Sequence, residues 1–261
     1  MSASVGVFDS GVGGLSVLAA LRDALPGVPL HYIADSANAP YGERSREFIT
    51  ERSLALTQHL RDQGAALVVV ACNTATAAAA DALRCQHPDL PIVGIEPGIK
   101  PAAAASRNGR VGVLATTATV NSARFQALIE RHAAGAQITA VACSGVVKHI
   151  EEGDLDSPAL RELVARYCAP LKLAGVDTAL LGCTHYPFIR TLWQAELGPG
   201  VQLLQIEEAV ALQAARLWST PLRAAAPAPI RLATTGEPAV LERLAREGLG
   251  WEGFALERCT V

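Results

Sequence analysis

Long apolar runs are absent from this sequence of 261 residues, and we expect no leader segment. The longest apolar candidate, ALVVVAC ending at Cys72, is far shorter than the roughly 18 to 20 residues that a membrane-spanning helix needs. The start, MSASVGVFDS, has neither the basic nor the apolar segment of a secretory signal. We therefore expect a cytoplasmic protein that does not associate with membranes.

Positive charge is also scarce. The 22 Lys and Arg residues are outnumbered by 25 Asp and Glu residues, which gives a formal net charge of -3 and a pI of about 6.1. No run of basic residues interleaved with aromatic residues occurs. This charge balance gives no general attraction toward a phosphate backbone, so we expect no nucleic-acid partner.

Cysteine pairs at CxxC spacing do not occur among the 6 cysteines. In a cytoplasmic chain of this length, such usage indicates free thiols rather than disulfide bonds or zinc ligands. A single cysteine is most often a small buried apolar residue. That is our interpretation of Cys85, Cys143, Cys168 and Cys259, whereas Cys72 and Cys183 differ because polar residues surround them.

Apolar content, by contrast, is high enough for a substantial core, at 50% hydrophobic against 18% charged residues. Short runs of Val, Ile and Leu alternate with helix-compatible stretches. This pattern is typical of α/β proteins with a doubly wound, mostly parallel sheet. We expect an amphipathic helix over 45–63. The expected strands are 5–9, 30–34, 66–71, 92–95, 111–115, 137–142, 177–182, 201–206 and 230–234.

Two parts of the sequence echo each other. VGVFDSGVGG from Val5 is answered 106 residues later by VGVLATTATV from Val111, and VVVACNTAT around Cys72 is answered by ALLGCTHYP, whose Cys183 lies 111 residues further on. We therefore expect two pseudo-symmetric α/β domains that face each other across a cleft at the carboxyl ends of their strands. The expected first domain is 1–97 plus 207–261, and the second is 98–206.

Cys72 and Cys183 each follow an apolar run at a predicted strand-to-helix transition. Helix N-terminal amides can stabilise a thiolate or bind a carboxylate there. A histidine two residues from a cysteine can assist proton transfer. The polar residues that follow the two cysteines are Asn73, Thr74, Thr184 and His185. A cysteine that only packs does not need such neighbours, so we interpret both as functional.

Polar residues at the first two strand ends allow two interpretations each. Asp9 and Ser10 can cap the helix after the GVGG turn, and Asp9 can be a proton-transfer partner of Cys72; the two roles are compatible. The loop ADSANAPYGER over 34–44 either contacts a substrate or is simply exposed.

Two further sites in the second half are equally open. Thr116 and Thr119 either bind a substrate or cap a helix. Glu151 and Glu152 look, from composition alone, like the solvated end of a helix closed by Gly153.

Together these segments resemble the glutamate racemases. The matching pieces are FDSGVGGLSV, PYGER, VVVACNTATA, GIEPG, GVLATTATV, EEG and DTALLGCTHYP. CNTAT followed by GCTHYP is highly specific, and the resemblance covers roughly residues 5 to 210. It implies a two-base racemisation of glutamate at Cα without pyridoxal phosphate, metal or nucleotide. It further implies a supply of D-glutamate for peptidoglycan and a homodimer.

The resemblance also implies roles for individual residues. Cys72 would take the α-proton from D-glutamate while Cys183 supplies one to the opposite face, with the roles exchanged in reverse. Asp9 would assist Cys72 and His185 would assist Cys183, while Glu151 would hold or tune the Cys183 side. The implied substrate-binding residues are Asp9, Ser10, Pro40, Tyr41, Gly42, Cys72, Asn73, Thr74, Thr116, Thr119, Cys183, Thr184 and His185.

Other enzyme classes fit the residues less well. A racemase for aspartate would share the paired cysteines. A nucleotide-dependent oxidoreductase is disfavoured because Ser16 occupies the third glycine position of GxGxxG and Asp9 would repel a pyrophosphate. Pyridoxal chemistry needs a Schiff-base lysine, and the only lysines, Lys100, Lys148 and Lys172, lie outside the matched loops. A non-enzymatic amino-acid binding module would explain a cleft but not two matched cysteines.

Overall fold

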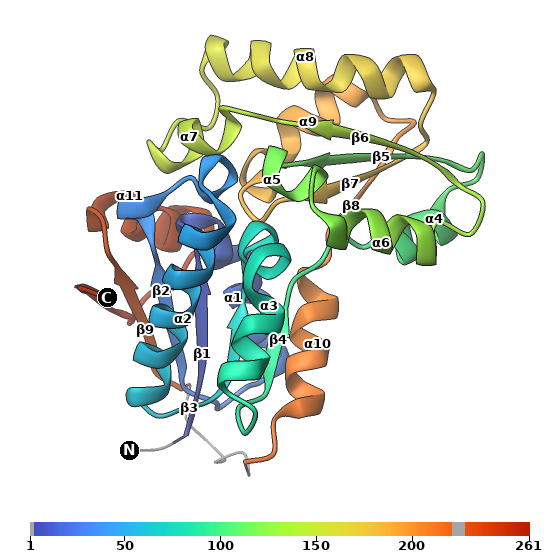
Figure 1. Cartoon of the computed structure of the whole chain (residues 1–261). Helices are drawn as coiled ribbons and strands as arrows, with labels where there is room; N and C mark the ends of the chain where they lie inside the picture. The colour runs from blue at the N-terminus through green and yellow to red at the C-terminus, as the bar shows by residue number, and fades with distance from the viewer. Residues whose placement is uncertain (1–2, 221–227) are drawn as a thin grey trace. The chain divides into compact units, whose positions relative to one another are not determined.

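The chain folds into two compact units. The computed structural model describes residues 3–220 and 228–261. The first unit consists of Met1–Ile95 and Glu207–Val261, and the second consists of Glu96–Ile206. The colours of Figure 1 follow the chain from the first unit into the second and back, so the first unit is discontinuous in sequence.

The first unit contains a sheet of parallel strands in the order β10-β9-β2-β1-β3-β4. Its strands are β1 (Ser4–Asp9), β2 (Leu30–Ala34), β3 (Ala65–Val70), β4 (Ile92–Gly94), β9 (Ile230–Thr234) and β10 (Ala255–Arg258). All side chains of β1 are buried, as expected for a central parallel strand with helices on both faces.

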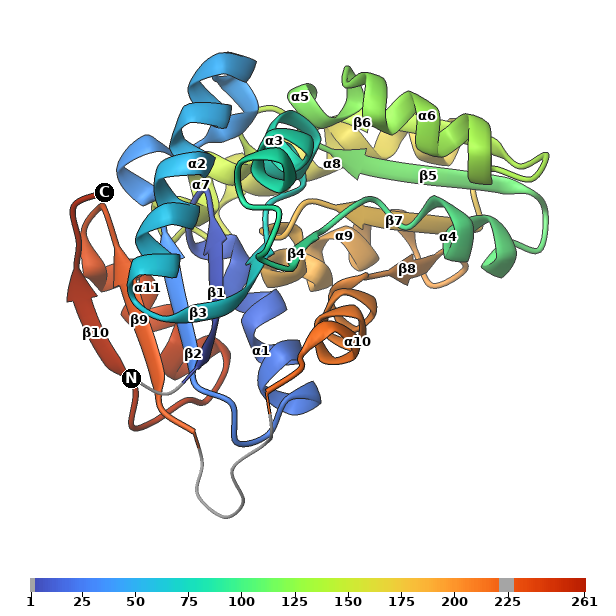
Figure 2. The same ribbon diagram turned by 60° about the horizontal axis from the view of Figure 1, so that its bottom comes forward.

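Helices cover both faces of this sheet. Figure 2 shows α2 and α3 packed together on one face and α1 and α10 packed together on the other. The helices are α1 (Leu15–Ala24), α2 (Arg46–Asp62), α3 (Asn73–Gln86), α10 (Glu207–Leu217) and α11 (Pro238–Arg243), with short turns η1 (Val12–Gly14), η2 (Ser36–Asn38), η3 (Tyr41–Glu43) and η5 (Leu244–Gly248). Ser45 caps α2 by accepting a hydrogen bond from the Phe48 amide.

The second unit is a smaller sheet of parallel strands in the order β6-β5-β7-β8. Figure 1 shows α8 and α9 on one face of it and α4 and α6 on the other. Its strands are β5 (Arg110–Ala115), β6 (Gln137–Ala142), β7 (Thr178–Gly182) and β8 (Gln202–Leu204). Its helices are α4 (Ile99–Ala105), α5 (Thr117–Val120), α6 (Ala123–His132), α7 (Val146–Glu151), α8 (Pro158–Ala174), η4 (Tyr186–Ile189) and α9 (Arg190–Leu197).

Both units share one strand order. In the first unit the order β2-β1-β3-β4 runs from the second strand to the first, third and fourth, and β6-β5-β7-β8 repeats that order in the second unit. The echoed segments therefore fall on equivalent strands, namely β1 with β5 and β3 with β7. The prediction of an α/β protein built from two related parallel sheets is confirmed.

Two strand predictions need correction. The strand expected over 201–206 is confined to β8, because the chain leaves the sheet before Ile206, which is buried outside any strand. The edge strand β10 was not expected from its sequence, ALER, because most of its side chains are exposed and charged residues interrupt the apolar pattern. Among the residues described, no helix is long and apolar enough to cross a bilayer.

One apolar cluster of the first unit bears directly on the candidate site. It contains Phe8 of β1, Val70 of β3 and Ile49 of α2, and it also contains Tyr41 and Cys72. Burying each such side chain contributes roughly 1.5 to 3 kcal/mol to folding. The surroundings of Cys72 are therefore fixed by the main core of the unit.

Candidate active site

Cys72 lies at the start of a helix directly after a buried strand. β3 ends at Val70, and the side chain of Cys72 caps α3 by accepting a hydrogen bond from the Ala75 amide at 3.4 Å. The thiol is buried, with 4% of the residue exposed. Amides at a helix N-terminus favour a negative charge, so this position favours the thiolate over the thiol.

Ser10 connects this thiol with a buried carboxylate. Cys72 Sγ lies 3.6 Å from Ser10 Oγ, and Ser10 Oγ donates to Asp9 Oδ1 at 3.2 Å. The Ser10 amide also donates to Asp9 Oδ1, at 2.6 Å. Asp9 is fully buried at the end of β1. The predicted grouping of Asp9 with Cys72 is present in the fold, and a hydroxyl joins the two.

The alternative role for Asp9 and Ser10, as helix caps, is wrong. η1 has Gly11 at its N-cap and α1 has Gly14, neither with a side-chain capping bond. The turn instead packs tightly against the carboxylate: a Cβ at Gly14 would lie 2.8 Å from Asp9 Cβ and 2.8 Å from Tyr32 Cε2. Glycine is needed there because the backbone passes so close to Asp9.

Asn73 and Thr74 begin α3 beside the thiol, and both are buried. Neither Nδ2 nor Oδ1 of Asn73 has a hydrogen-bond partner among the described residues. A buried amide without partners costs about 1 to 3 kcal/mol, and such groups in proteins call for an explanation. A polar ligand next to Cys72 would supply the missing bonds.

The loop after β2 combines buried and half-buried residues. Tyr41 is buried, and its hydroxyl donates to Asp35 Oδ2 at 2.5 Å, whereas Pro40 and Gly42 are half-buried. The interpretation of this loop as simply exposed is therefore wrong for Tyr41. The Tyr41 hydroxyl thus donates its proton to the hydrogen bond with Asp35, which leaves only its acceptor lone pairs for another group.

In the second unit, Cys183 follows β7 and lies beside a buried histidine. Cys183 Sγ is 3.8 Å from His185 Nδ1, and His185 Nε2 is 2.5 Å from Glu151 Oε1. Thr184, between them in sequence, is also buried. The fold thus brings Glu151 at the end of α7 to the side of the imidazole that faces away from the thiol.

The charge state of His185 follows from these two contacts. Burial lowers its pKa, but the hydrogen bonds to Cys183 and Glu151 and the negative charges of both groups outweigh burial and raise the pKa well above its usual value. An imidazolium between a carboxylate and a thiol stabilises the thiolate form of that thiol. The interpretation of Glu151 as a solvated helix end is therefore wrong, whereas Glu152 is exposed as expected.

Thr116 and Thr119 follow β5, the strand equivalent to β1. Thr116 Oγ1 accepts from the Thr119 amide at 3.2 Å and donates to Thr119 Oγ1 at 2.9 Å. Thr116 thus caps α5, as one of the two interpretations expected. Substrate binding by these hydroxyls stays a prediction.

The remaining cysteines lie apart from these contacts, and all six are free thiols. Burial raises the pKa of Cys143 and raises the pKa of Cys168 to about 12. Cys259 is half-buried, and Cys85 is exposed near the end of α3, so its interpretation as a buried apolar residue is wrong. Across residues 3–220 and 228–261, no cluster of three or more His, Cys, Asp or Glu has the arrangement of a metal site.

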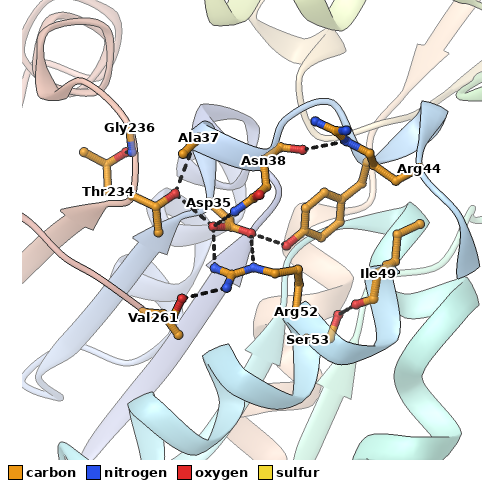
Figure 3. Close-up of polar contacts among 12 residues, drawn as sticks. Asp35, Ala37, Asn38, Arg44, Ile49, Arg52, Ser53, Thr234, Gly236 and Val261 are labelled. Carbon is orange, nitrogen blue, oxygen red and sulfur yellow. Dashed lines mark hydrogen bonds and ion pairs between the residues drawn. The ribbon is translucent and has the colours of Figure 1, made fainter. Parts of the chain in front are cut away.

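Sequence reasoning treated Asp35 only as part of the loop over 34–44, which either contacts a substrate or is exposed. The structure makes this side chain the centre of a buried polar network, which includes Tyr41. Figure 3 shows its contacts with Arg52. Its position directly after β2 was the available signal, because polar residues at the carboxyl ends of parallel strands often serve a site.

Two related parallel sheets, each with a cysteine after its third strand, are the features by which this class of racemase can be compared with known proteins. The sequence model of the Asp/Glu/Hydantoin racemase family matches residues 14–214, and the chain belongs to this family. The resemblance predicted from sequence is thereby confirmed.

Similar proteins carry a more specific name. The chain is 54% identical over 215 residues to a glutamate racemase of Ectopseudomonas mendocina, covering 82% of each chain. It is 51% identical over 246 residues to a glutamate racemase of Pseudomonas aeruginosa, covering 93% of this chain and 92% of the relative. The crystal structure of Escherichia coli glutamate racemase in complex with L-glutamate and an activator matches with a TM-score of 0.86 at 32% identity, covering 100% of this chain and 99% of that one.

Proposed function

We propose that this protein is a cofactor-independent glutamate racemase that interconverts L- and D-glutamate with Cys72 and Cys183. The observation that carries the proposal is the equivalence of the two thiols. Each follows the third strand of the same strand order, and each lies beside a group suited to proton transfer. A protein that only bound an amino acid would not need this duplication.

The reaction begins with proton removal. In the direction from D- to L-glutamate, the Cys72 thiolate takes the α-proton and becomes a thiol, which leaves a carbanion stabilised as an enediolate on the α-carboxylate. The Cys183 thiol then donates its proton to the opposite face of Cα and becomes a thiolate. The reverse direction exchanges the two roles, so one thiol must be ionised and the other protonated at the start of each turnover.

The surroundings of each thiol support this alternation. The Ala75 amide and the α3 N-terminus favour the Cys72 thiolate, and Ser10 with Asp9 provides a route for its proton. The His185 imidazolium, held by Glu151, lies beside Cys183 Sγ and can exchange a proton with it. An α-proton is very weakly acidic, so positioning and hydrogen bonds to the enediolate must supply the rest of the stabilisation.

The polar groups near the thiols fit an amino-acid substrate. The unpartnered amide of Asn73 and the hydroxyls of Ser10, Thr74, Thr116, Thr119 and Thr184 can bind carboxylates and an ammonium group without a buried arginine. Glutamate is favoured over aspartate because relatives at about half identity are named glutamate racemases. The crystal structure with L-glutamate concerns the Escherichia coli protein, and its fold is the same.

The setting of this activity is part of the proposal. The product D-glutamate would supply peptidoglycan synthesis and hence the shape of the cell wall. The reaction would take place in the cytoplasm, where thiols stay reduced. We also propose a homodimer, which sedimentation of the purified protein would test.

The test is racemisation in deuterium oxide. Purified protein is incubated with D-glutamate without added cofactor, and circular dichroism and proton NMR follow inversion and loss of the Cα proton. Cys72→Ser and Cys183→Ser are run beside the wild type. Cys85→Ser is the matched control, because Cys85 is an exposed thiol on the same helix that Cys72 caps.

We expect deuterated L-glutamate from the wild type and from Cys85→Ser. Each of the other variants should lose racemisation by on the order of 10³-fold, the range that a positioned acid or base contributes. If the protein racemised aspartate and not glutamate, the proposed substrate would be wrong but the two-thiol mechanism would stand. Full activity in either cysteine variant would refute the two-thiol mechanism.

A further inference from the structure

The loop that joins β2 to α2 is tied to one buried carboxylate. Figure 3 shows Asp35 with Arg52 on one side and the loop on the other. Arg52 Nη2 donates to Asp35 Oδ1 at 2.8 Å and Arg52 Nε donates to Oδ2 at 3.0 Å, so the pair is bidentate. The Asp35 side chain is fully buried, and 17% of the Arg52 side chain is exposed.

Three further groups donate to the same carboxylate. The Tyr41 hydroxyl donates to Oδ2 at 2.5 Å, and Asn38 Nδ2 and Thr235 Oγ1 donate to Oδ1 at 3.0 and 2.9 Å. Five donors therefore satisfy one buried carboxylate. Such a network holds only when every member is in place, because a buried charge that loses its partners costs several kcal/mol.

The network joins segments that are distant in sequence. Thr235 follows β9. Arg52 Nη1 also donates to the Val261 carbonyl oxygen at 2.6 Å, as Figure 3 shows. At the other end, the Asp35 amide donates to the Asp9 carbonyl oxygen at 2.9 Å. The backbone of Asp35 is thus bonded to the residue that carries the carboxylate beside Cys72.

Tyr41 connects the Asp35 network with the surroundings of the Cys72 thiol. Its ring belongs to the same buried cluster as Cys72, and η3, which Tyr41 begins, packs against α3, which Cys72 caps. Burial and the adjacent Asp35 carboxylate raise the pKa of Tyr41 above its usual value, so it stays a phenol and a hydrogen-bond donor at every working pH. The ring therefore has a fixed orientation beside the thiol.

We infer that Asp35, held by Arg52, is a positioning residue of the racemase that fixes Tyr41 and the Pro40–Gly42 loop as one wall of the glutamate site at Cys72. The inference rests on the proposed function, because that function places glutamate beside this loop. Asp35 itself touches no reacting atom. Its effect passes through the Tyr41 hydroxyl and should appear in substrate binding rather than in proton transfer.

The experiment compares Asp35→Asn and Tyr41→Phe with Asp89→Asn. Tyr41→Phe keeps the ring and removes only the hydroxyl that donates to Asp35. Asp89→Asn is the matched control, because it removes the aspartate that pairs with Arg61, another arginine of α2. That pair is exposed, and Arg61 lies far along α2 from Arg52. KM and kcat are measured in both directions for each protein.

A second readout does not depend on turnover. Cys72 is alkylated with iodoacetamide, and peptide mass spectrometry separates its labelling from that of the exposed Cys85. The glutamate concentration that halves the rate of Cys72 labelling reports binding. Thermal unfolding of each variant reports stability in parallel.

We expect Asp35→Asn to raise both KM and the half-protecting concentration by about tenfold while kcat changes less than about threefold, since a hydrogen bond to a charged group is worth about that much. Tyr41→Phe should raise both by about threefold, and Asp89→Asn should change neither. A residue that only stabilised the fold would lower the unfolding temperature and leave both binding readouts unchanged in the folded protein, which would overturn the inference.

The outcomes separate this inference from the proposed function. If Asp35→Asn does not fold, Tyr41→Phe decides the question, and unchanged KM and protection in that variant would refute the positioning role. If the wild type neither racemises glutamate nor is protected by it, the proposed function fails first, and the inference falls with it.

Discussion

Cys72 and Cys183 follow equivalent strands, yet their surroundings are chemically different. Around Cys72 the contacts are a serine hydroxyl and a helix amide, with the Asp9 carboxylate behind the serine. Around Cys183 the contact is a fully buried imidazole that a carboxylate binds from its far side. A hydroxyl and a helix amide thus lie beside one thiol, and an ion pair lies beside the other.

This difference shows that duplication of the strand order has not preserved the acid–base chemistry at the strand ends. Dipoles at a helix start stabilise a thiolate at any pH, because they do not titrate. An imidazolium stabilises it only while the ring stays protonated. The two thiols should therefore respond differently to substitution and to pH, although they take part in one reaction.

The largest expected difference between the two thiols is in the kcat of His185→Gln and Ser10→Ala. Loss of the imidazole removes the charged partner of Cys183 and should lower kcat by about 10²- to 10³-fold, whereas loss of the Ser10 hydroxyl removes one neutral hydrogen bond and should lower kcat by about tenfold. Circular dichroism at 25 °C with both enantiomers gives the rates.

His132→Gln is the control for the histidine, because it removes an imidazole at the end of α6 in the same unit. It should leave kcat unchanged. Equal losses for Ser10→Ala and His185→Gln would mean that the two thiols depend on their surroundings to the same degree, and the contrast between them would carry no functional weight.

Glu151→Gln sharpens the comparison through pH. Glu151 raises the pKa of His185, so the imidazolium of the wild type persists well above the usual pKa of 6.5. Without that charge the pKa of His185 falls, and the imidazolium is lost at lower pH. The basic limb of the kcat profile should move to lower pH, because the imidazolium loses the carboxylate that stabilises it.

The matched control is Glu152→Gln, which neutralises the exposed neighbour on the same helix end. Its pH profile should superimpose on that of the wild type. A Glu151→Gln profile that kept its basic limb in place would show that the charge of His185 does not limit the reaction.

Sequence patterns predicted the frame of the site but not its contacts. Apolar runs marked eight of the strands closely because central parallel strands are buried on both faces. The polar residues around Cys72 and Cys183 indicated where these strands end, because a strand buried on both faces stays apolar up to its end. The Glu151–His185 contact spans 34 residues, and composition near Glu151 favoured a solvated helix end.

The Asp35 network was harder still to foresee. Its Thr235 and Val261 members lie 200 and 209 residues from their partners, and they meet Asp35 and Arg52 only because β9 pairs with β2. No local spacing encodes that pairing. The capping role expected for Asp9 was wrong because η1 lies between β1 and α1, so that Gly14, and not Asp9, is at the N-cap of α1.

The smallest expected effect is on the free energy of unfolding. It concerns the hydrogen bonds that hold the end of α7, the helix that carries Glu151, in the unit of Cys183. After α7, Asp154 Oδ1 accepts from the Ser157 amide at 2.9 Å and Asp154 Oδ2 accepts from Ser157 Oγ at 2.5 Å. His149 Nδ1 of α7 lies 2.7 Å from Asp154 Oδ2. The hydrogen bond from the Ser157 hydroxyl, with the others, holds the pKa of Asp154 below its usual value.

A depressed pKa in the folded state means that the ionised carboxylate stabilises the fold above about pH 3.9, the unfolded value, and that this contribution is lost as pH falls through the folded pKa. Asp154→Asn should therefore lower the free energy of unfolding at pH 7 by about 0.5 to 1.5 kcal/mol, with the difference from wild type shrinking below about pH 4. Urea unfolding at several pH values measures this, with the exposed Asp156→Asn as control. A loss that persisted undiminished at pH 3 would assign the stabilisation to packing of the Asp154 side chain rather than to its charge.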